Sequence, residues 1–162
     1  MIISHTRRSE SSALLTAIES ENAAIFAYGV VAAFSNPARV NEVATHTAAH
    51  RARRDALVAL STDAGETPPT AAAAYEIPFP VTDAVTAAQL AAQIESDTAV
   101  IYRAFVEQVD TDQLRTFGID GLTDAAIRGA GWRSALGTAP ATSAFPGTPL
   151  HNCCAPLLTA GG

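Results

Sequence analysis

Cysteine is almost absent from this sequence: the only two, Cys153 and Cys154, are adjacent and close to the C-terminal end. Adjacent cysteines pair with each other only under strain, and no third cysteine is present to pair with either of them. A disulfide framework is therefore excluded. The one other use of these thiols that the sequence suggests is a metal ion shared between two subunits.

Long apolar runs are missing as well. The first ten residues, MIISHTRRSE, hold no apolar stretch of signal-peptide length, and no run approaches the roughly 20 apolar residues of a membrane span. We therefore expect a cytoplasmic protein without a membrane partner. The chain also lacks a glycine-rich phosphate loop, a Ser-His-Asp arrangement and a Cys-x-x-Cys pair, so the sequence offers no support for a hydrolase or nucleotide-binding function.

Basic residues are fewer than acidic ones, 10 against 16, which gives a net charge of −6 and a pI near 5.0. This balance argues against nucleic acid or an anionic membrane as a partner. The one basic cluster, Arg51, Arg53 and Arg54, has Asp55 beside it. We interpret it as an ion-paired or solvated helix face.

Aromatic residues are scarce too, at 6%, whereas alanine is very abundant among the 48% of apolar residues. Alanine has the highest helix propensity of the amino acids, so this composition favours an all-helical protein with closely packed helices. A length of 162 residues suits one domain with a sizeable core.

Capping and breaking residues divide the chain into four predicted helices, over residues 9–34, 37–64, 83–109 and 112–136. Asn36 with Pro37, and Thr82, are typical of helix starts, and Gly65 and Gly137 are typical of helix ends. Residues 1–8 are predicted to be a disordered lead, residues 9–137 the bundle, and residues 138–162 a Pro/Gly-rich tail. Within the tail, residues 145–147 are expected to fold back on the bundle.

The segment 66–81 contains four prolines and is not a helix. Its length suits a crossover along the outside of a bundle, and the alternation of Tyr75, Ile77 and Phe79 suggests that it is anchored there. A loose linker between two domains is the alternative. Short links between the first two and the last two helices, with one long link between them, predict an up-down-down-up four-helix bundle.

Each predicted helix carries a polar residue near the middle of its apolar stripe: Glu21, His50, Glu95 and Asp124, with Arg128 one turn beyond Asp124. Antiparallel packing brings such positions to a common level. A buried carboxylate is costly unless it finds a partner, and this is where helical bundles build carboxylate-bridged metal sites. The five residues are therefore the candidate site.

Several segments resemble an alanine-rich actinobacterial family of ferritin-like proteins that has no assigned function. They are ENAAIFAYGVV (21–31), HRARRDAL (50–57), PFPVTD (78–83), LTDAAIRGAGWR (122–133) and FPG (145–147), and together they span nearly the whole chain to about residue 147. The proline-containing PFPVTD segment is the most specific of them. The resemblance implies a ferritin-like bundle.

The resemblance to metal-binding ferritins breaks at individual positions. Those proteins use a Glu on the first and third helices and a Glu-x-x-His pair on the second and fourth. Glu21, Glu95 and His50 match, but Thr47 stands where the second helix needs a carboxylate, and Arg128 follows the fourth-helix position that needs a histidine. A di-metal site thus lacks at least two of its six ligands. His46, one turn before His50, would add a nitrogen.

Arg128 favours a different interpretation, because a permanently charged guanidinium on the core stripe stands where a metal ion would be. We therefore expect a non-catalytic bundle without a cofactor, in which a buried Arg-carboxylate-His network replaces the metal layer. It would serve as an interaction or assembly module with an unknown protein partner. Gly29 and Gly131 suit close helix association, and we expect a homodimer.

The alternative function is enzymatic or metal-handling. Glu21, His50, Glu95 and Asp124 would hold one iron or manganese ion, or a degenerate di-metal centre, in an oxidoreductase or a metal-binding protein. Tyr28 or Tyr102 would lie nearby as a redox-active or hydrogen-bonding group. Both tyrosines are better explained as core residues with satisfied hydroxyls.

Overall fold

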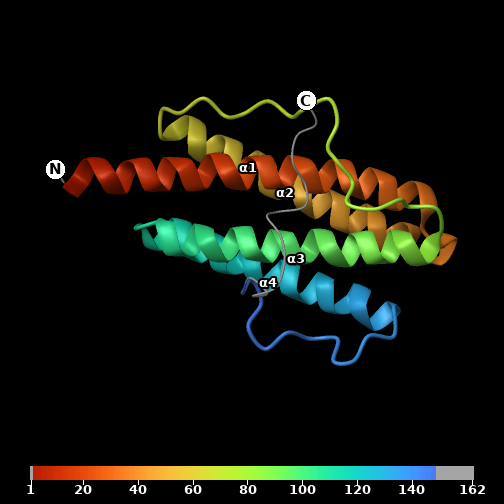
Figure 1. Ribbon diagram of the computed structural model, residues 1–162. Helices are drawn as coiled ribbons and strands as arrows, with labels where there is room; N and C mark the ends of the chain where they lie inside the picture. Colours follow the sequence, from red (N-terminus) through yellow and green to blue (C-terminus); the bar gives the residue numbers. More distant parts are fainter. Residues whose placement is uncertain (1, 149–162) are drawn as a thin grey trace.

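The computed structural model describes residues 2–148, and these residues are all-helical. Four α-helices and one short 3-10 helix are present in this range: α1 (Ile2–Phe34), η1 (Pro37–Arg39), α2 (Val40–Asp63), α3 (Ala84–Gln108) and α4 (Asp112–Ala135) (Figure 1). The predicted all-α class is confirmed. Most of the predicted tail, with Cys153 and Cys154, lies outside the described residues.

The start of the first helix differs from the prediction. α1 begins at Ile2, so residues 2–8 continue the helix instead of forming a disordered lead. No proline or glycine occurs before Gly29, and nothing in the local sequence therefore opposes helix in the first eight residues.

The other helix boundaries follow from capping. The Asn36 side chain accepts a hydrogen bond from the Ala38 amide at 2.9 Å, with Pro37 at the first helical position. α3 is capped by Asp83 rather than by Thr82: the Asp83 carboxylate accepts from the Thr86 amide at 2.8 Å, and the Thr86 hydroxyl accepts from the Asp83 amide at 3.1 Å. This reciprocal pair is a capping box.

Neighbouring helices in the bundle run antiparallel. α1 packs against α2 and α3, and α3 packs against α4. Glu21 of α1 contacts Tyr102 of α3, whereas Tyr28 further along α1 contacts Glu95 earlier in α3. Figure 1 shows residues 64–83 running along the outside of the helices from the end of α2 to the start of α3. The ring of Tyr75 in this segment lies 5.6 Å from that of Phe26.

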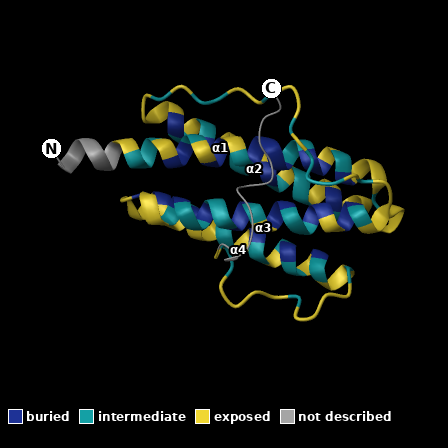
Figure 2. Ribbon diagram, in the orientation of Figure 1, coloured by how far each residue is buried: buried dark blue, intermediate teal, exposed yellow. Residues whose placement is uncertain are grey.

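The core consists of two apolar clusters that follow each other along the bundle. One surrounds Trp132 and Ile94, and the other surrounds Ile18 and Phe105. Figure 2 shows the buried residues on the inner faces of the helices. The predicted polar residues of α1, α2 and α3 lie between the two clusters, so water is excluded from them on both sides.

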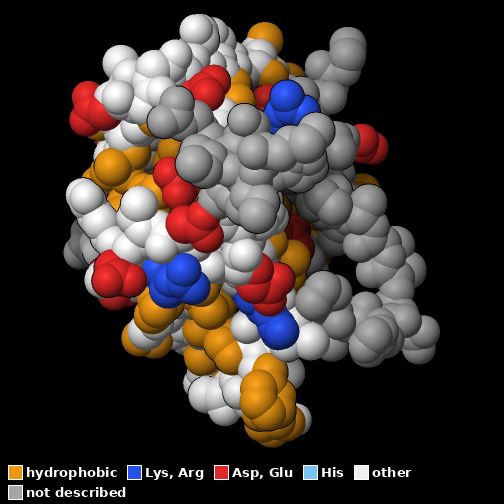
Figure 3. Space-filling view, turned by 90° about the vertical axis from the view of Figure 1, so that its left-hand side faces the viewer, with side chains coloured by type: hydrophobic (Ala, Val, Ile, Leu, Met, Phe, Trp, Pro, Cys, Tyr) orange, Lys and Arg blue, Asp and Glu red, His pale blue; other side chains and the backbone are white. Residues whose placement is uncertain are grey.

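The surface carries charges of both signs. Figure 3 shows one end of the bundle, where acidic and basic side chains lie beside each other. Among the described helices, none combines the length and the apolar character that a membrane crossing requires.

Within the chain, close helix packing occurs at Gly118 and Gly121 and not at Gly29 or Gly131. A Cβ atom at Gly29 or Gly131 would meet nothing within 4 Å. A Cβ atom at Gly118 would lie 2.7 Å from Val106, and one at Gly121 would lie 2.7 Å from the ring of Tyr102. The contact between α3 and α4 therefore explains the glycines in the first half of α4.

This difference predicts opposite effects of two otherwise identical substitutions. Gly121→Ala should lower the free energy of unfolding by about 1–3 kcal/mol, because the new methyl group displaces the Tyr102 ring. Gly131→Ala should raise it by up to about 1 kcal/mol, because alanine gains helix propensity where space is open. Urea unfolding followed by circular dichroism measures both, and equal effects of the two variants would contradict the packing of α4 on Tyr102.

Candidate functional site

His50 of α2 lies between two buried carboxylates. Its Nδ1 is 2.6 Å from Glu21 Oε2 on α1, and its Nε2 is 3.2 Å from Glu95 Oε1 on α3. The exposed fraction is 1% or less for all three residues. The structure thus brings together three of the residues that the sequence singled out.

Each carboxylate also accepts a tyrosine hydroxyl from the opposite helix. Tyr102 of α3 donates to Glu21 Oε1 at 2.6 Å, and Tyr28 of α1 donates to Glu95 Oε1 at 2.6 Å. Both tyrosines are fully buried, and burial first, then the adjacent carboxylate, raises the pKa of each hydroxyl. They are hydrogen-bond donors to this site and remain protonated at neutral pH.

Arg128 completes the arrangement from α4. Its Nε donates to Glu95 Oε1 at 2.9 Å, and its side chain is only 11% exposed. We use the term polar layer for Glu21, Tyr28, His50, Glu95, Tyr102 and Arg128. Glu95 Oε1 accepts three hydrogen bonds in this layer, whereas the buried Oε2 has no partner among the described residues.

The charges of the polar layer balance. Burial alone would lower the pKa of His50, but the hydrogen bonds and charges of Glu21 and Glu95 raise it to about 9. Burial alone would raise the pKa of Glu95, but His50 and Arg128 lower it. At neutral pH, one imidazolium and one guanidinium therefore face two carboxylates. Both ring nitrogens of the imidazolium carry hydrogen, so each donates to one carboxylate.

The two tyrosines were not assigned to specific partners from the sequence, although a signal for them exists. Glu and Tyr stand seven positions apart in α1, at 21 and 28, and again in α3, at 95 and 102. Seven positions are nearly two helical turns, so both residues share a face. Two antiparallel helices with this same spacing bring the Glu of one opposite the Tyr of the other.

Asp124 is the candidate that the structure places elsewhere. Its side chain is 49% exposed and forms an ion pair with Arg53 of α2. The inner face of α4 runs instead along Gly121, Ala125, Gly129 and Trp132. The prediction that Asp124 belongs to the buried set is therefore wrong, because its position lies on the flank of α4 that faces α2.

Arg53 was predicted only as part of a charged cluster, and it has a more specific position. Its guanidinium lies 5.4 Å from the ring centroids of both Tyr102 and Phe117, a distance suited to cation–π contact. Arg54 of the same cluster pairs with Asp55 at 2.7 Å. The predicted ion pairing therefore accounts for Arg54. Arg53 is ion-paired as well, but its guanidinium also lies over the ring of Tyr102, a member of the polar layer.

His46 lies beside the polar layer and contacts no carboxylate in it. Its Nδ1 is 3.2 Å from Trp132 Nε1 and 3.3 Å from the Tyr28 hydroxyl. Partial burial lowers its pKa, so the ring is neutral at pH 7 and Nδ1 accepts the Trp132 hydrogen. Trp132 is 1% exposed, as expected of a core residue.

Comparison with known proteins identifies the family. A family described as "Domain of unknown function (DUF4439)" matches residues 13–150. The chain belongs to the DUF4439 family. The crystal structure of a conserved hypothetical protein, rv2844, from Mycobacterium tuberculosis is similar, with 37% identity and a TM-score of 0.78, over 80% of this chain and 98% of that one. No curated protein matches.

The polar layer of this DUF4439 chain does not fit a metal ion. Among residues 8–148, whose side chains the structure describes, no group of three or more His, Cys, Asp or Glu side chains is arranged to hold one. Metal ligation requires a free nitrogen lone pair on histidine, but both ring nitrogens of His50 donate to carboxylates. Arg128 contributes a further positive charge 2.9 Å from Glu95, which would repel a cation.

Proposed function

We propose that this DUF4439 chain is a non-catalytic, ferritin-like bundle in which an Arg-carboxylate-His network stands in place of a metal centre. The observation that carries the proposal is the pairing of Glu21 and Glu95 with His50 and Arg128 at 2.6–3.2 Å. Buried charges that are fully paired define helix register more than they add stability. The network therefore serves the architecture of the bundle.

The ferritin-like topology is part of this proposal. It is supported by the antiparallel contacts of α1 with α2 and of α3 with α4, and by the course of residues 64–83 along the outside of the bundle (Figure 1). This arrangement corresponds to an up-down-down-up bundle with one crossover. The 37% identity to a mycobacterial protein supports an actinobacterial origin.

We propose that the bundle acts by association, as a homodimer that presents a surface to another protein. Two large apolar residues of α4 are exposed, Ile119 by 47% and Ile127 by 66%. Gly131 continues the same helical face one turn later, with nothing within 4 Å of its Cβ position. An exposed apolar face with a glycine in it suits contact with the helix of a second copy.

The alternative function is binding of one iron or manganese ion by Glu21, His50 and Glu95, without Asp124. One observation favours it: Glu95 Oε2 is buried and has no partner among the described residues. A buried oxygen without a hydrogen-bond partner is uncommon in a native core, and a bound cation would supply the missing partner. This function would require His50 to release both of its hydrogen bonds.

Elemental analysis and sedimentation of the same sample test both functions. The protein would be purified without a histidine tag after growth with added iron and manganese. We expect a folded helical dimer, about twice the 16.7 kDa of the chain, with far less than one metal ion per chain. Near-stoichiometric metal that disappears in His50→Ala but persists in Glu42→Gln, a surface carboxylate variant, would establish the alternative instead.

A further inference from the structure

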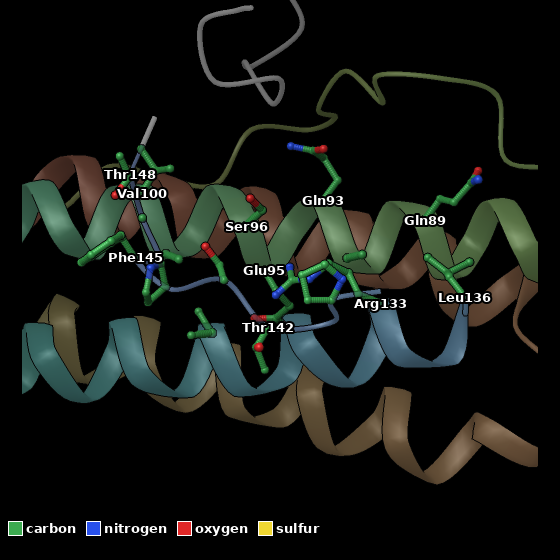
Figure 4. A pocket seen from close by; sticks show the side chains of 18 residues that line it. Gln89, Gln93, Glu95, Ser96, Val100, Arg133, Leu136, Thr142, Phe145 and Thr148 are labelled. Carbon is green, nitrogen blue, oxygen red and sulfur yellow. The ribbon is translucent and has the colours of Figure 1, made fainter. Parts of the chain in front are cut away.

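A pocket of about 480 Å³ lies between α3, α4 and the segment that follows α4, with Glu95 of the polar layer in its lining (Figure 4). Residues 138–148 fold back over α3. A Cβ atom at Gly147 would lie 2.5 Å from the Ala99 carbonyl oxygen, and Arg103 donates to the Thr148 hydroxyl. The volume falls within the range of small-molecule sites.

Arg133 is the cation of this pocket. Its Nε donates to the Ala141 carbonyl at 2.5 Å, which holds the guanidinium between α4 and the folded-back segment. Among the described residues, no acceptor contacts its two amino nitrogens and no carboxylate pairs with it, so that its side chain donates to Ala141 alone. Residues 149–162 contain no Asp or Glu side chain. Figure 4 shows Arg133 and Glu95 between α3 and α4, with Thr142 beside them.

The walls limit the kind of molecule that fits. Small and apolar side chains, among them Ala99, Ala126 and Leu136, line much of the pocket. Glu95 also lines it, but His50 and Arg128 already neutralise that carboxylate. One unpaired guanidinium beside an apolar wall matches one carboxylate on an apolar body, because a guanidinium binds a carboxylate through two parallel hydrogen bonds.

We propose that this pocket binds small organic carboxylates with an apolar body, with Arg133 as the anchor of the carboxylate. A dianionic phosphate ester suits it less well, because the single guanidinium of Arg133 balances only one of its two negative charges. The anchor of the proposed site, Arg133, lies outside the polar layer, and Glu95 is shared between that layer and the lining of the pocket.

Titration with phenylacetate, phenylacetamide and phenyl phosphate, followed by amide chemical shifts in NMR spectra, tests the proposal. We expect phenylacetate to saturate with a Kd of about 1–10 mM and to shift the amides of Ala99 and Gly147. Phenylacetamide, its neutral counterpart, should bind at least tenfold more weakly. The absence of saturable phenylacetate binding would overturn the proposal. Phenylacetamide binding as tightly as phenylacetate, or phenyl phosphate binding tenfold more tightly, would overturn it as well.

Two variants locate the bound molecule. Arg133→Gln should weaken phenylacetate binding at least tenfold, whereas Arg51→Gln, an exposed arginine of α2, should leave it unchanged. Because Arg133→Gln also removes the contact with Ala141, Ala126→Leu provides an independent test: it fills the pocket and leaves Arg133 intact. Unchanged binding in Ala126→Leu would place the molecule elsewhere and overturn the proposal.

Discussion

Arg128→Leu is expected to lower the free energy of unfolding by about 3–5 kcal/mol. Glu95 is completely buried, and the substitution removes one of the two cations that face the two carboxylates of the polar layer. The remaining imidazolium then balances only one negative charge. Removing one partner from a buried ion pair costs far more than the pair itself contributes, because the other charge remains in a medium of low polarity.

Urea unfolding of Arg128→Leu and of Arg51→Leu provides the measurement and its control. Arg51 is exposed on α2, so its substitution should change stability by less than about 0.5 kcal/mol. The double variant Arg128→Leu/Glu95→Gln should recover part of the loss, because it removes the unpaired charge together with its partner. A cost below about 1 kcal/mol for Arg128→Leu would show that Arg128 lies outside the network.

Raising the pH from 6.5 to 9.5 is expected to remove on the order of 3 kcal/mol of stability through His50 alone. The pKa of His50 is about 9 in the folded protein and about 6.5 in an unfolded chain. The folded state therefore holds this proton more tightly. The stabilisation is complete below about pH 6.5, decreases as the pH rises, and is lost above about pH 9.

Few other groups titrate in this window. All 10 basic residues are arginines, which remain charged. Asp97, whose pKa burial raises to about 6, and His46, whose pKa is lowered, change charge at lower pH. The raised pKa values of Tyr28 and Tyr102 place their titration above it. The two cysteines do titrate here, so the experiment is best done with Cys153 and Cys154 replaced by serine.

The control for this pH dependence is His50→Gln, measured by urea unfolding at the same pH values. The variant should be less stable than the parent protein at pH 6.5 and should show a much smaller change between pH 6.5 and 9.5. Glu21→Gln, which removes the negative charge of one acceptor of His50, should move the loss of stability to lower pH. An equal slope in the parent protein and in His50→Gln would exclude His50 as its source.

Local signals in the sequence were sufficient for most helix boundaries and for four of the six residues of the polar layer. Asn36 with Pro37, and the two glycines at 65 and 137, mark boundaries that the structure reproduces to within a residue or so. Glu21, His50 and Glu95 each lie on a helical stripe of apolar residues. The apolar side chains are large enough to indicate which face of the helix is buried. The sequence places the start of α1 too late, because the absence of a helix-breaking residue is a weaker signal than the presence of a capping residue.

The fourth helix shows why the rest was harder to predict. Its buried face consists largely of glycine and alanine, and side chains so small leave little periodic contrast from which to orient a helix. Asp124 was therefore placed on the wrong face. The sequence does predict that residues 145–147 fold back on the bundle, as the contact of Gly147 with Ala99 shows, but the contact of Arg133 with Ala141 has no periodic signature in the sequence.

The matching of Glu21 with Tyr102 and of Glu95 with Tyr28 makes the contact between α1 and α3 self-complementary. The α1–α2 hairpin offers its neighbour one carboxylate and one hydroxyl seven positions apart, and the α3–α4 hairpin offers the same pair in return. This is the property of an interface with two-fold symmetry. The first hairpin of one chain therefore carries the groups needed to bind the second hairpin of another, so exchange of hairpins between copies would preserve every Glu–Tyr bond of this contact.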